Sequence, residues 1–471
     1  AAVGGARRAG GVGRALAPAP SRTMRRAGSA LLGCLAVLLR ASPAAAASEY
    51  YAICDAGSTG TRLYIFDLDI SKSTAKSLFV KKTKPALTTY ASNPADAVPP
   101  LLELFKEGAE SVPKVKRPRV QVMIVGTAGM RMLDKEVQDR IWKAVRDGIM
   151  AKDSGFPFSK MKLETRTASG VEEGTWALTT ANFLTGRVTH SLIATHEKEH
   201  PIGLMDLGGG STQIAVPTQM GAVVHSYLGF GMTHIREQIH NESRGGEDLG
   251  CYMRGYTVGP GKEGTGDATA CRGLISRVLA GRRQACIRGE HGERPCLGDL
   301  GELDKTVEAI KKGTIEFFGA AGMLYVADFV HWWLGIHAKA GGKVPSLAWD
   351  FKGNFPKPTL AELQSATDVL CSGDYGPLAE LTGTDGAHRY TQEDNAPYRC
   401  FQANYVLVLL EEIYGFSRDG RTVTFAAEHE GEDLEWPLGA MLFKRSGAPI
   451  PGERGQRPKP DVPDEYHRKE L

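Results

Sequence analysis

The sequence predicts an α/β protein in which two similar lobes each present a glycine-rich turn to one cleft. In residues 204–216, two short apolar runs flank the tip Asp206-Leu-Gly-Gly-Gly-Ser-Thr-Gln213. Residues 53–66 repeat the order of apolar run, aspartate, small residue, glycine, hydroxyl residues and apolar run. Two copies about 150 residues apart indicate duplicated lobes. The near-continuous apolar run 120–125 adds a strand buried on both faces, which is typical of a parallel sheet.

Each turn has the chemistry of an anion site. Glycine lacks a Cβ, so several backbone N–H groups can approach one anion closely. We expect phosphate contacts from Gly57, Ser58, Thr59, Gly60, Thr61 and Arg62 in the first turn and from Gly208, Gly209, Gly210, Ser211 and Thr212 in the second. Asp55 and Asp206 end the preceding strands. We expect them to hold Mg²⁺ or Ca²⁺, mainly through its waters, because Mg²⁺ dehydrates reluctantly.

The chain before the second turn alternates strand and helix signals. We expect strands within 49–66, mixed strand signals over 78–89 and a strand over 120–125, with helices over 98–108, 134–150 and 170–184. The strand at 120–125 runs into Gly126-Thr-Ala-Gly-Met-Arg131. Ligands of α/β folds bind at such carboxyl ends, so Thr127 joins the candidate site.

The chain beyond the second turn is less regular. Residues 225–230 predict a strand, and a helix is expected to start at 233. Residues 245–299 are rich in Gly, Arg and Cys with weak periodicity, which predicts a disulfide-tied, loop-rich insertion. Later helices are expected over 303–318, 323–335 and 396–414, with a turn and helix start at 436–442. Residues 447–471 are rich in proline and charge, which is typical of a disordered tail.

Residues 1–47 are interpreted as an upstream segment followed by a signal peptide. The first 48 residues contain seven arginines and no acid, and the apolar run 27–39 precedes a stretch of small residues. This order is typical of export and predicts the secretory pathway, either secretion or the lumen of the ER or Golgi. The alternative is a type II membrane anchor through 27–39, although this run is short for a span. The remainder is slightly acidic, so nucleic acid is not expected as a partner.

The eight cysteines agree with export. Cys34 lies in the signal, and Cys54 is expected to be a buried free thiol in the first strand. The remaining six allow 15 pairings. Their clustering favours two bridges among Cys251, Cys271, Cys286 and Cys296, plus Cys371–Cys400. A metal site is the alternative, but neither CxxC spacing nor a histidine pattern supports it. The sequon Asn241-Glu242-Ser243 predicts a glycoprotein.

These residues favour attack of water on a terminal phosphoryl group. Such transfer needs positioning, charge neutralisation and a group that orients the water. Glu173, near the start of a predicted helix, is the expected general base, and Gln213 would hold the same water. The structural alternatives are that Glu172 and Glu173 are helix N-terminal charges favoured by the dipole, and that Arg131 only makes an ion pair. No Gly-Xaa4-Gly-Lys-Ser/Thr occurs, which excludes a P-loop.

Five ordered motifs resemble the apyrases, or nucleoside triphosphate diphosphohydrolases, of the actin/hexokinase-like superfamily. The matching blocks are 55–62 (DAGSTGTR), 126–131 (GTAGMR), 170–174 (GVEEG) with Trp176 and Asn182, 206–213 (DLGGGSTQ), and Cys400-Phe401 with Tyr405 leading to 436–442 (WPLGAML). The resemblance implies two RNase H-like lobes with a nucleotide between them. The expected lobes are 48–190 and 191–436, with 437–446 rejoining the first.

The same resemblance implies dependence on Ca²⁺ or Mg²⁺ and removal of the terminal phosphate from nucleoside di- or triphosphates. It places the family's catalytic glutamate on Glu173, its water-holding residues on Ser211 and Gln213, its cleft threonine on Thr127, and its metal-organising aspartates on Asp55 and Asp206. Surface members of the family carry membrane spans at both ends. No apolar run follows 442, so the chain is similar to soluble or Golgi-type members that favour UDP and GDP.

The base pocket departs from the family pattern. Arg399 stands beside the Cys-Phe block, where several members carry an aromatic residue, and Tyr375 and Tyr398 are the candidates for base contact. Two other functions share the fold: an actin-like or heat-shock-chaperone-like nucleotide switch, and an exopolyphosphatase or sugar-kinase relative. The signal, cysteines and sequon oppose the switch, because such relatives work in reducing compartments. Oligomeric state is left open.

Overall fold

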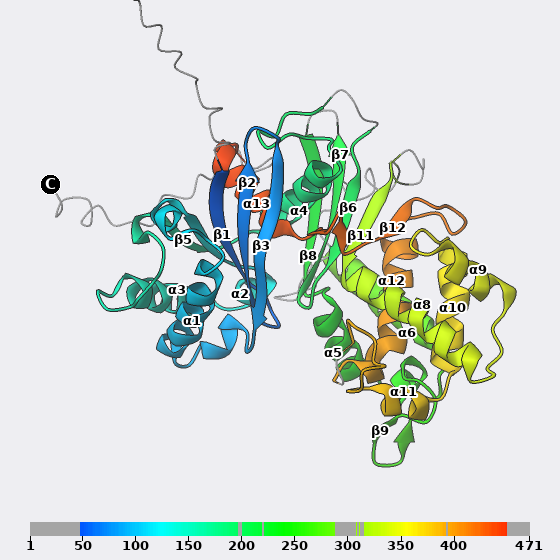
Figure 1. Cartoon of the computed structure of the whole chain (residues 1–471). Helices are drawn as coiled ribbons and strands as arrows, with labels where there is room; N and C mark the ends of the chain where they lie inside the picture. Colours follow the sequence, from blue (N-terminus) through cyan, green and yellow to red (C-terminus); the bar gives the residue numbers. More distant parts are fainter. Residues whose placement is uncertain are drawn as a thin grey trace, which may run out of the picture. The chain divides into compact units, whose positions relative to one another are not determined.

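Two five-stranded sheets form the framework of the protein (Figure 1). The computed structural model describes residues 48–195, 200–218, 221–287, 308, 310, 315–391 and 394–449. The first sheet has the order β3-β2-β1-β4-β5 and the second β12-β11-β6-β7-β8. In each, three antiparallel strands are followed by two parallel ones, so the predicted α/β class with two similar lobes is confirmed.

The strand bounds show how closely the lobes correspond. The first sheet contains β1 (Ser48–Ala56), β2 (Thr61–Asp69), β3 (Thr74–Thr83), β4 (Gln121–Gly126) and β5 (Leu163–Thr167). The second contains β6 (Gly203–Leu207), β7 (Ser211–Thr218), β8 (Gly221–Leu228), β11 (Phe317–Ala321) and β12 (Val423–Phe425). Asp55 pairs with Arg62 on the antiparallel side and with Val125 on the parallel side. Asp206 pairs in the same way with Gln213 and Ala320, so the two aspartates occupy equivalent places.

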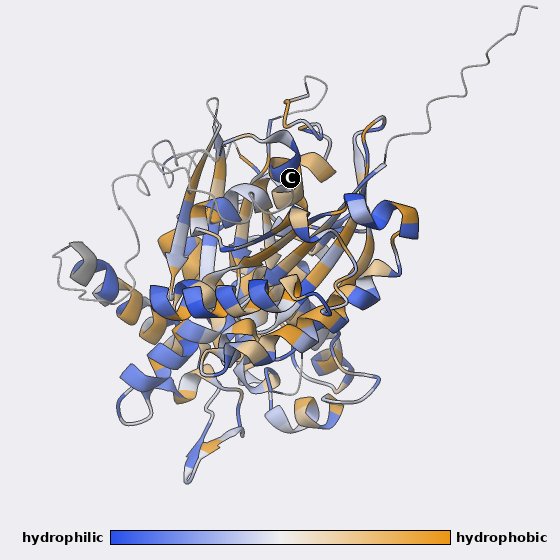
Figure 2. Cartoon of the chain, turned by 90° about the vertical axis from the view of Figure 1, so that its left-hand side faces the viewer, coloured by the Kyte–Doolittle hydropathy of each residue, from blue (hydrophilic) through white to orange (hydrophobic). Residues whose placement is uncertain are grey.

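The helices cover both faces of the sheets. They are α1 (Val98–Ala109), α2 (Ala128–Arg131), α3 (Lys135–Met150), α4 (Gly170–Leu184), α5 (Met232–Glu242), α6 (Ala268–Ile287), α8 (Gly322–Lys339), α9 (Ser346–Asn354), α10 (Leu360–Ser372), α11 (Tyr375–Leu381), α12 (Arg399–Val408) and α13 (Trp436–Ser446). Two small hairpins complete the set: β9 (Thr257–Gly259) with β10 (Lys262–Glu263), and β13 (Glu428–His429) with β14 (Glu432–Asp433). Figure 2 shows apolar residues concentrated in the central strands.

Helices α4 and α13 lie between the two sheets. One apolar core joins inner-face residues of both sheets, such as Ile53 and Leu204, to Trp176 of α4 and Met441 of α13. The close crossing of α4 and α13 requires Gly439, because a Cβ there would collide with the Trp176 carbonyl. Helix α13 also packs on β1, where the chain was expected to rejoin the first lobe. The lobe boundaries themselves stay a prediction.

Two predictions for the second half of the chain are wrong. Phe317 and Phe318 were placed at the end of a helix but lie in β11, where they face opposite cores, as neighbouring residues of a buried strand must. Part of the insertion expected to be loop-rich is the 20-residue helix α6. Its buried residues Cys271, Leu274, Ile275 and Leu279 do follow helical spacing, but the arginines between them obscure the pattern.

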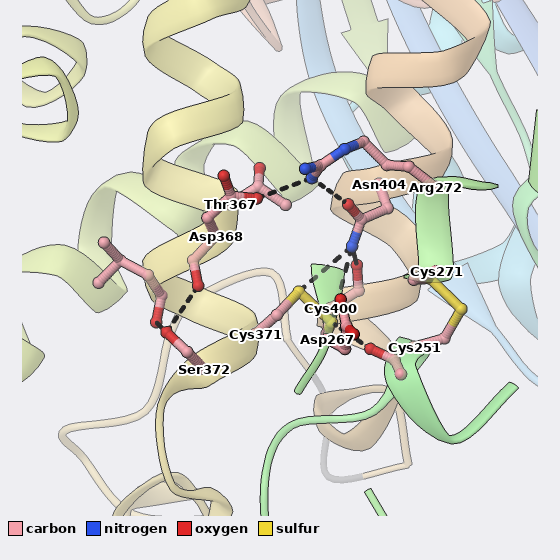
Figure 3. The surroundings of a disulfide bond; sticks show 12 residues. Cys251, Asp267, Cys271, Arg272, Thr367, Asp368, Cys371, Ser372, Cys400 and Asn404 are labelled. Atoms are coloured by element: carbon pink, nitrogen blue, oxygen red, sulfur yellow. Dashed lines mark hydrogen bonds and ion pairs between the residues drawn. A yellow bond between two sulfur atoms is a disulfide. The ribbon is translucent and has the colours of Figure 1, made fainter. Parts of the chain in front are cut away.

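Among the described residues, two disulfides tie the second lobe (Figure 3). Cys371–Cys400 joins α10 to α12, as predicted, and Cys251–Cys271 is one bridge within the expected group of four. Asn404 lies beside Cys371–Cys400 and donates its amide to the Cys400 carbonyl at 2.8 Å. Cys54 is free and buried, as predicted.

No helix in the described part of the chain is long and apolar enough to cross a membrane. The signal or anchor predicted within 1–47 and nearly all of the tail predicted at 447–471 lie outside the described residues.

Candidate active site

A cavity of about 260 Å³ lies between the two glycine-rich turns. The β1–β2 turn contributes Gly57, Ser58, Thr59 and Gly60, and the β6–β7 turn contributes Gly208, Gly209, Gly210 and Ser211. Thr127, at the end of β4, and the first residues of α8 complete much of the wall. The structure therefore brings the two predicted turns to one cavity.

Glycine lets these turns approach each other. A Cβ on Gly209 would lie 2.8 Å from the Ser58 Oγ, and one on Gly210 would lie 3.0 Å from the Ala128 Cβ. Both distances are shorter than ordinary contact, so a larger residue would force the neighbouring groups of the other lobe to shift. Thr61 and Thr212 are predicted phosphate contacts that do not line the cavity. Thr212 is buried, and its hydroxyl donates to the Asp206 carbonyl at 2.8 Å.

Asp55 and Asp206 both line the cavity from equivalent strand ends. Burial, followed by the charge of Glu173, raises the pKa of Asp206 to about 8, and the same causes raise the pKa of Asp55 well above its usual value. Asp55 Oδ1 is buried and has no hydrogen-bond partner. Carboxylate oxygens that repel each other and lack a donor fit a hard divalent cation. Among the described residues no three His, Cys, Asp or Glu groups converge as direct ligands.

Glu173 lies in the first turn of α4 and reaches the same cavity. Its Oε2 forms an ion pair with Arg131 Nη1 at 2.8 Å. Gln213 Nε2 lies 3.5 Å from that oxygen and donates to Ser211 Oγ at 2.8 Å. The three predicted water-handling residues thus form one network, although Gln213 itself stands behind the cavity wall. Arg131 does make the ion pair considered as its structural alternative, and its partner is Glu173.

The same helix turn explains the division between the two glutamates. Glu172 Oε2 accepts the Ser169 N–H at 2.8 Å, and Ser169 Oγ accepts the Glu172 N–H at 3.1 Å, which is a complete capping box. Arg166 pairs with Glu172 at 2.7 Å. The Glu172 side chain thus stabilises the N-terminus of α4, and it does not line the cavity. Glu173, one residue later, lines the cavity.

Comparison with known proteins finds a nucleoside phosphatase family domain in the chain. Residues 43–256 match the model of the GDA1/CD39 (nucleoside phosphatase) family. The chain is 27% identical over 433 residues to "Probable apyrase 2" of Oryza sativa subsp. japonica, covering 84% of this chain and 85% of the relative. The matched segment is a GDA1/CD39 family domain, and apyrase relatives extend the similarity over most of the chain. The protein is a nucleoside phosphate hydrolase, as the sequence predicted.

Further similarities extend over most of this phosphatase. It is 21% identical to "Nucleoside-diphosphatase mig-23" of Caenorhabditis elegans, covering 85% of this chain and 78% of the relative. The crystal structure of nucleoside triphosphate hydrolases from Neospora caninum superposes with a TM-score of 0.54 at 16% identity, covering 85% of this chain and 93% of that chain. At that identity the superposition shows the fold alone, which is the two-lobed actin/hexokinase-type fold.

Several cavity residues of the phosphatase were not identified from the sequence, and four of them carry charged or aromatic side chains. Glu435 and Lys82 lie near the phosphate turns, and Tyr325 and Tyr390 lie on the α8 side. Glu435 directly precedes the matched block at 436–442, a position that could have drawn attention to it. Burial opposes its charge, but Arg62 and the hydroxyl of Tyr64 hold its pKa below the usual value. Glu435 therefore adds a further carboxylate to the cavity wall.

The two tyrosines proposed for base contact do not line the cavity. The Arg236 guanidinium covers the ring of Tyr398 at 3.7 Å, and Tyr375 packs edge-on against Tyr256 at 4.8 Å. Tyr325 and Tyr390 occupy the cavity instead, with ring centroids 4.6 Å apart.

Arg399, noted beside the Cys-Phe block, lines the same end of the cavity as Tyr390. Its guanidinium donates to the Tyr390 carbonyl at 2.8 Å and to Gln402 Oε1 at 2.8 Å. It also donates to Thr391 Oγ1, at 2.7 Å from Nη2. Burial lowers the pKa of Arg399 to about 10. Arg399 thus fixes the loop that carries Tyr390.

Proposed function

We propose that this phosphatase hydrolyses the terminal phosphate of nucleoside di- and triphosphates with the help of Mg²⁺ or Ca²⁺, using Glu173 as the general base. One observation carries the proposal: two equivalent glycine turns, two equivalent aspartates and Glu173 line one cavity. A polyanion with a divalent ion is the ligand that this combination of N–H donors and carboxylates accommodates. The printed names of the relatives, an apyrase and a nucleoside-diphosphatase, agree with it.

The chain's own residues would carry out the reaction as follows. The two turns hold the phosphate oxygens through backbone N–H groups and the hydroxyls of Ser58, Thr59 and Ser211. Water attacks the terminal phosphorus while Glu173 takes its proton, and the anhydride P–O bond breaks with the nucleotide as leaving group. Ser211 orients the water, and Gln213 supports it by donating to the Ser211 hydroxyl from behind the cavity wall. A cation held by the waters around Asp55 and Asp206 would neutralise charge on the phosphates.

The α8 side of the cavity supports a nucleotide rather than a bare phosphate chain. Tyr325 and Tyr390 offer aromatic surface there, and Arg399 fixes the loop that carries Tyr390. A base is flat and carries polar edges, so these groups fit it. We propose that Tyr325 and Tyr390, and not Tyr375 and Tyr398, contact the base. We retain diphosphates such as UDP and GDP as the favoured substrates, a proposal that rests on the family resemblance.

The two disulfides of the described residues support an oxidising compartment, because disulfides persist there. We therefore propose that the enzyme works in the secretory pathway.

A substrate panel tests the proposal. Phosphate release would be measured from UDP, GDP, ADP, ATP and inorganic polyphosphate, each with Mg²⁺, with Ca²⁺ and with EDTA. The proposal expects turnover of nucleotides with either ion and none with EDTA. Turnover of polyphosphate alone would replace it by an exopolyphosphatase. Tight nucleotide binding with at most one turnover per molecule would replace it by a nucleotide switch.

A further inference from the structure

Two cations lie opposite each other beside the first phosphate turn. Arg62 of β2 and Lys82 of β3 are direct partners in the antiparallel register, so their side chains leave the same face of the sheet. Both line the cavity. Only Arg62 was expected to meet phosphate, since Lys82 stands outside every sequence motif. The structure assigns different partners to the two.

Arg62 is committed to protein groups. Its Nη1 bonds both carboxylate oxygens of Glu435, and it donates to the Tyr64 hydroxyl at 2.9 Å. Burial works against its charge, but Glu435 and Tyr64 raise the pKa of Arg62. A guanidinium already neutralised by a buried carboxylate has little charge left to offer to a substrate. Arg62 therefore serves to hold Glu435, the residue that begins α13.

Lys82 is directed onto the phosphate turn. Its side chain passes over Gly60, where an added Cβ would lie 2.8 Å from Lys82 Cε. Its ammonium then donates to Thr59 Oγ1, at the tip of the turn, at 2.9 Å. A Cβ at Gly60 would therefore displace the stem of the lysine, in addition to colliding with the Thr83 carbonyl at 2.6 Å. The path leads to the place where the phosphates are expected.

Lys82 differs from its neighbours in making no close ion pair. Burial and Arg62 lower its pKa, and the carboxylates of Asp55 and Glu435 act on it only from a greater distance. Lys81, on the opposite face of β3, pairs with Glu107 at 2.6 Å, and Arg131 pairs with Glu173. Within the residues that the structure describes, no carboxylate lies within 4.0 Å of the Lys82 ammonium. An accessible ammonium without a carboxylate, at the tip of an anion-binding turn, is a ready partner for a phosphate oxygen.

We propose that Lys82 binds a non-bridging phosphate oxygen of the substrate, as a charge carried to the first turn across Gly60. This inference rests on the proposed function, because it takes the two turns as the phosphate site. Lys82 would supply the mobile positive charge of the site, and the Arg62–Glu435 pair would supply rigidity.

The test compares Lys82→Met with Lys82→Arg and with Lys81→Met as the matched control on the same strand. Removing one charge-stabilising donor from a phosphoryl-transfer site is expected to lower kcat/KM by about 10²–10³-fold. Lys82→Arg keeps the charge and should recover activity to within about tenfold, and Lys81→Met should stay within about twofold. Melting temperatures report whether Lys82→Met folds. If it does not, Lys82→Gln takes its place. Gly60→Ala is avoided because its Cβ would also lie 2.6 Å from the Thr83 carbonyl.

Binding of inorganic phosphate separates this inference from the proposed function. Inhibition by inorganic phosphate, or its binding by calorimetry, should weaken at least about tenfold in Lys82→Met and remain unchanged in Lys81→Met. If the wild-type protein hydrolyses no nucleotide, the proposed function is wrong. The role of Lys82 is then still tested by comparing the binding of inorganic phosphate to the wild-type and Lys82→Met proteins. Nucleotide turnover and phosphate binding both within threefold of wild type in a folded Lys82→Met protein would overturn the assignment of Lys82.

Discussion

Replacing Glu173 by glutamine tests the proposed base most directly. The change keeps the shape of the side chain and removes its charge and its ability to take a proton. A positioned base is typically worth about 10²–10⁴ in rate. Glu173→Gln should therefore lower kcat by about 10²–10⁴-fold, equivalent to about 3–5 kcal/mol of transition-state free energy.

The same substitution also lowers the free energy of unfolding, and the contacts of Arg131 limit how large this loss can be. Arg131 loses its charged partner at 2.8 Å, and the two side chains are only 13% and 10% exposed. Arg131 keeps its hydrogen bonds to the Ala168 carbonyl and to Ser211 Oγ, both at 3.1 Å. We expect a loss of about 1–3 kcal/mol in the free energy of unfolding. Because folded domains have about 5–15 kcal/mol to lose, unfolding cannot account for the loss of rate.

Steady-state phosphate release, combined with chemical denaturation, separates the two effects. Glu172→Gln is the matched control, since Glu172 is the adjacent acid in the same helix turn and serves the capping box. It should cost about 1–2 kcal/mol of stability and leave kcat within about threefold. The base assignment would be refuted by a folded Glu173→Gln protein that turns over within threefold of wild type. An equal loss of kcat in the folded Glu172→Gln control would also refute it, because the effect would then belong to the helix start.

Three further predictions concern the rest of the cavity. Chelation by EDTA should abolish turnover, and addition of either Mg²⁺ or Ca²⁺ should restore it. The Asp206→Asn protein should need about tenfold more cation than wild type for half-maximal turnover. Full activity in EDTA would reject the proposed role of the cation. Tyr390→Ala should raise KM for nucleotides about tenfold at nearly constant kcat, because it removes stacking on the base in the bound ground state. Tyr375→Ala should change neither KM nor kcat. The reverse pattern would assign the base contact to Tyr375 instead. Glu435→Gln should lower the free energy of unfolding by a constant amount from pH 8 to about pH 5. The reason is that the pKa of Glu435 is lowered in the folded protein, so its ion pair with Arg62 contributes fully at every pH above the unfolded pKa of about 4.3. Denaturation curves of the two proteins should converge as the pH falls through the folded pKa, and a difference that grows on acidification would contradict the pairing.

The parts that sequence analysis recovered are local in the chain. Each glycine turn carries its aspartate, glycines and hydroxyls within a few residues, so its chemistry is readable without knowledge of the fold. Helix α4 likewise carries its own start signal in Ser169 and Glu172, and its predicted bounds agree with the structure. The duplication was also readable, because it repeats one local pattern.

The parts that were missed depend on partners distant in the chain. Arg62 looked available for phosphate because Glu435, which neutralises it, lies 373 residues away. Tyr398 looked available for a base because nothing in its surroundings along the chain indicates that Arg236 covers its ring.

The sequence by itself determined the class of fold, the two phosphate turns and the type of chemistry, because propensity, glycine spacing and short motifs act over a few residues. Only the tertiary structure decided which charges remain available in the cavity and which are neutralised. Lys82 and Arg62 are both cations on adjacent strands, and the sequence gives no reason to separate their roles. Their difference arises from the packing of α13 against the first sheet, which brings one carboxylate to Arg62 and leaves Lys82 beside the phosphate turn.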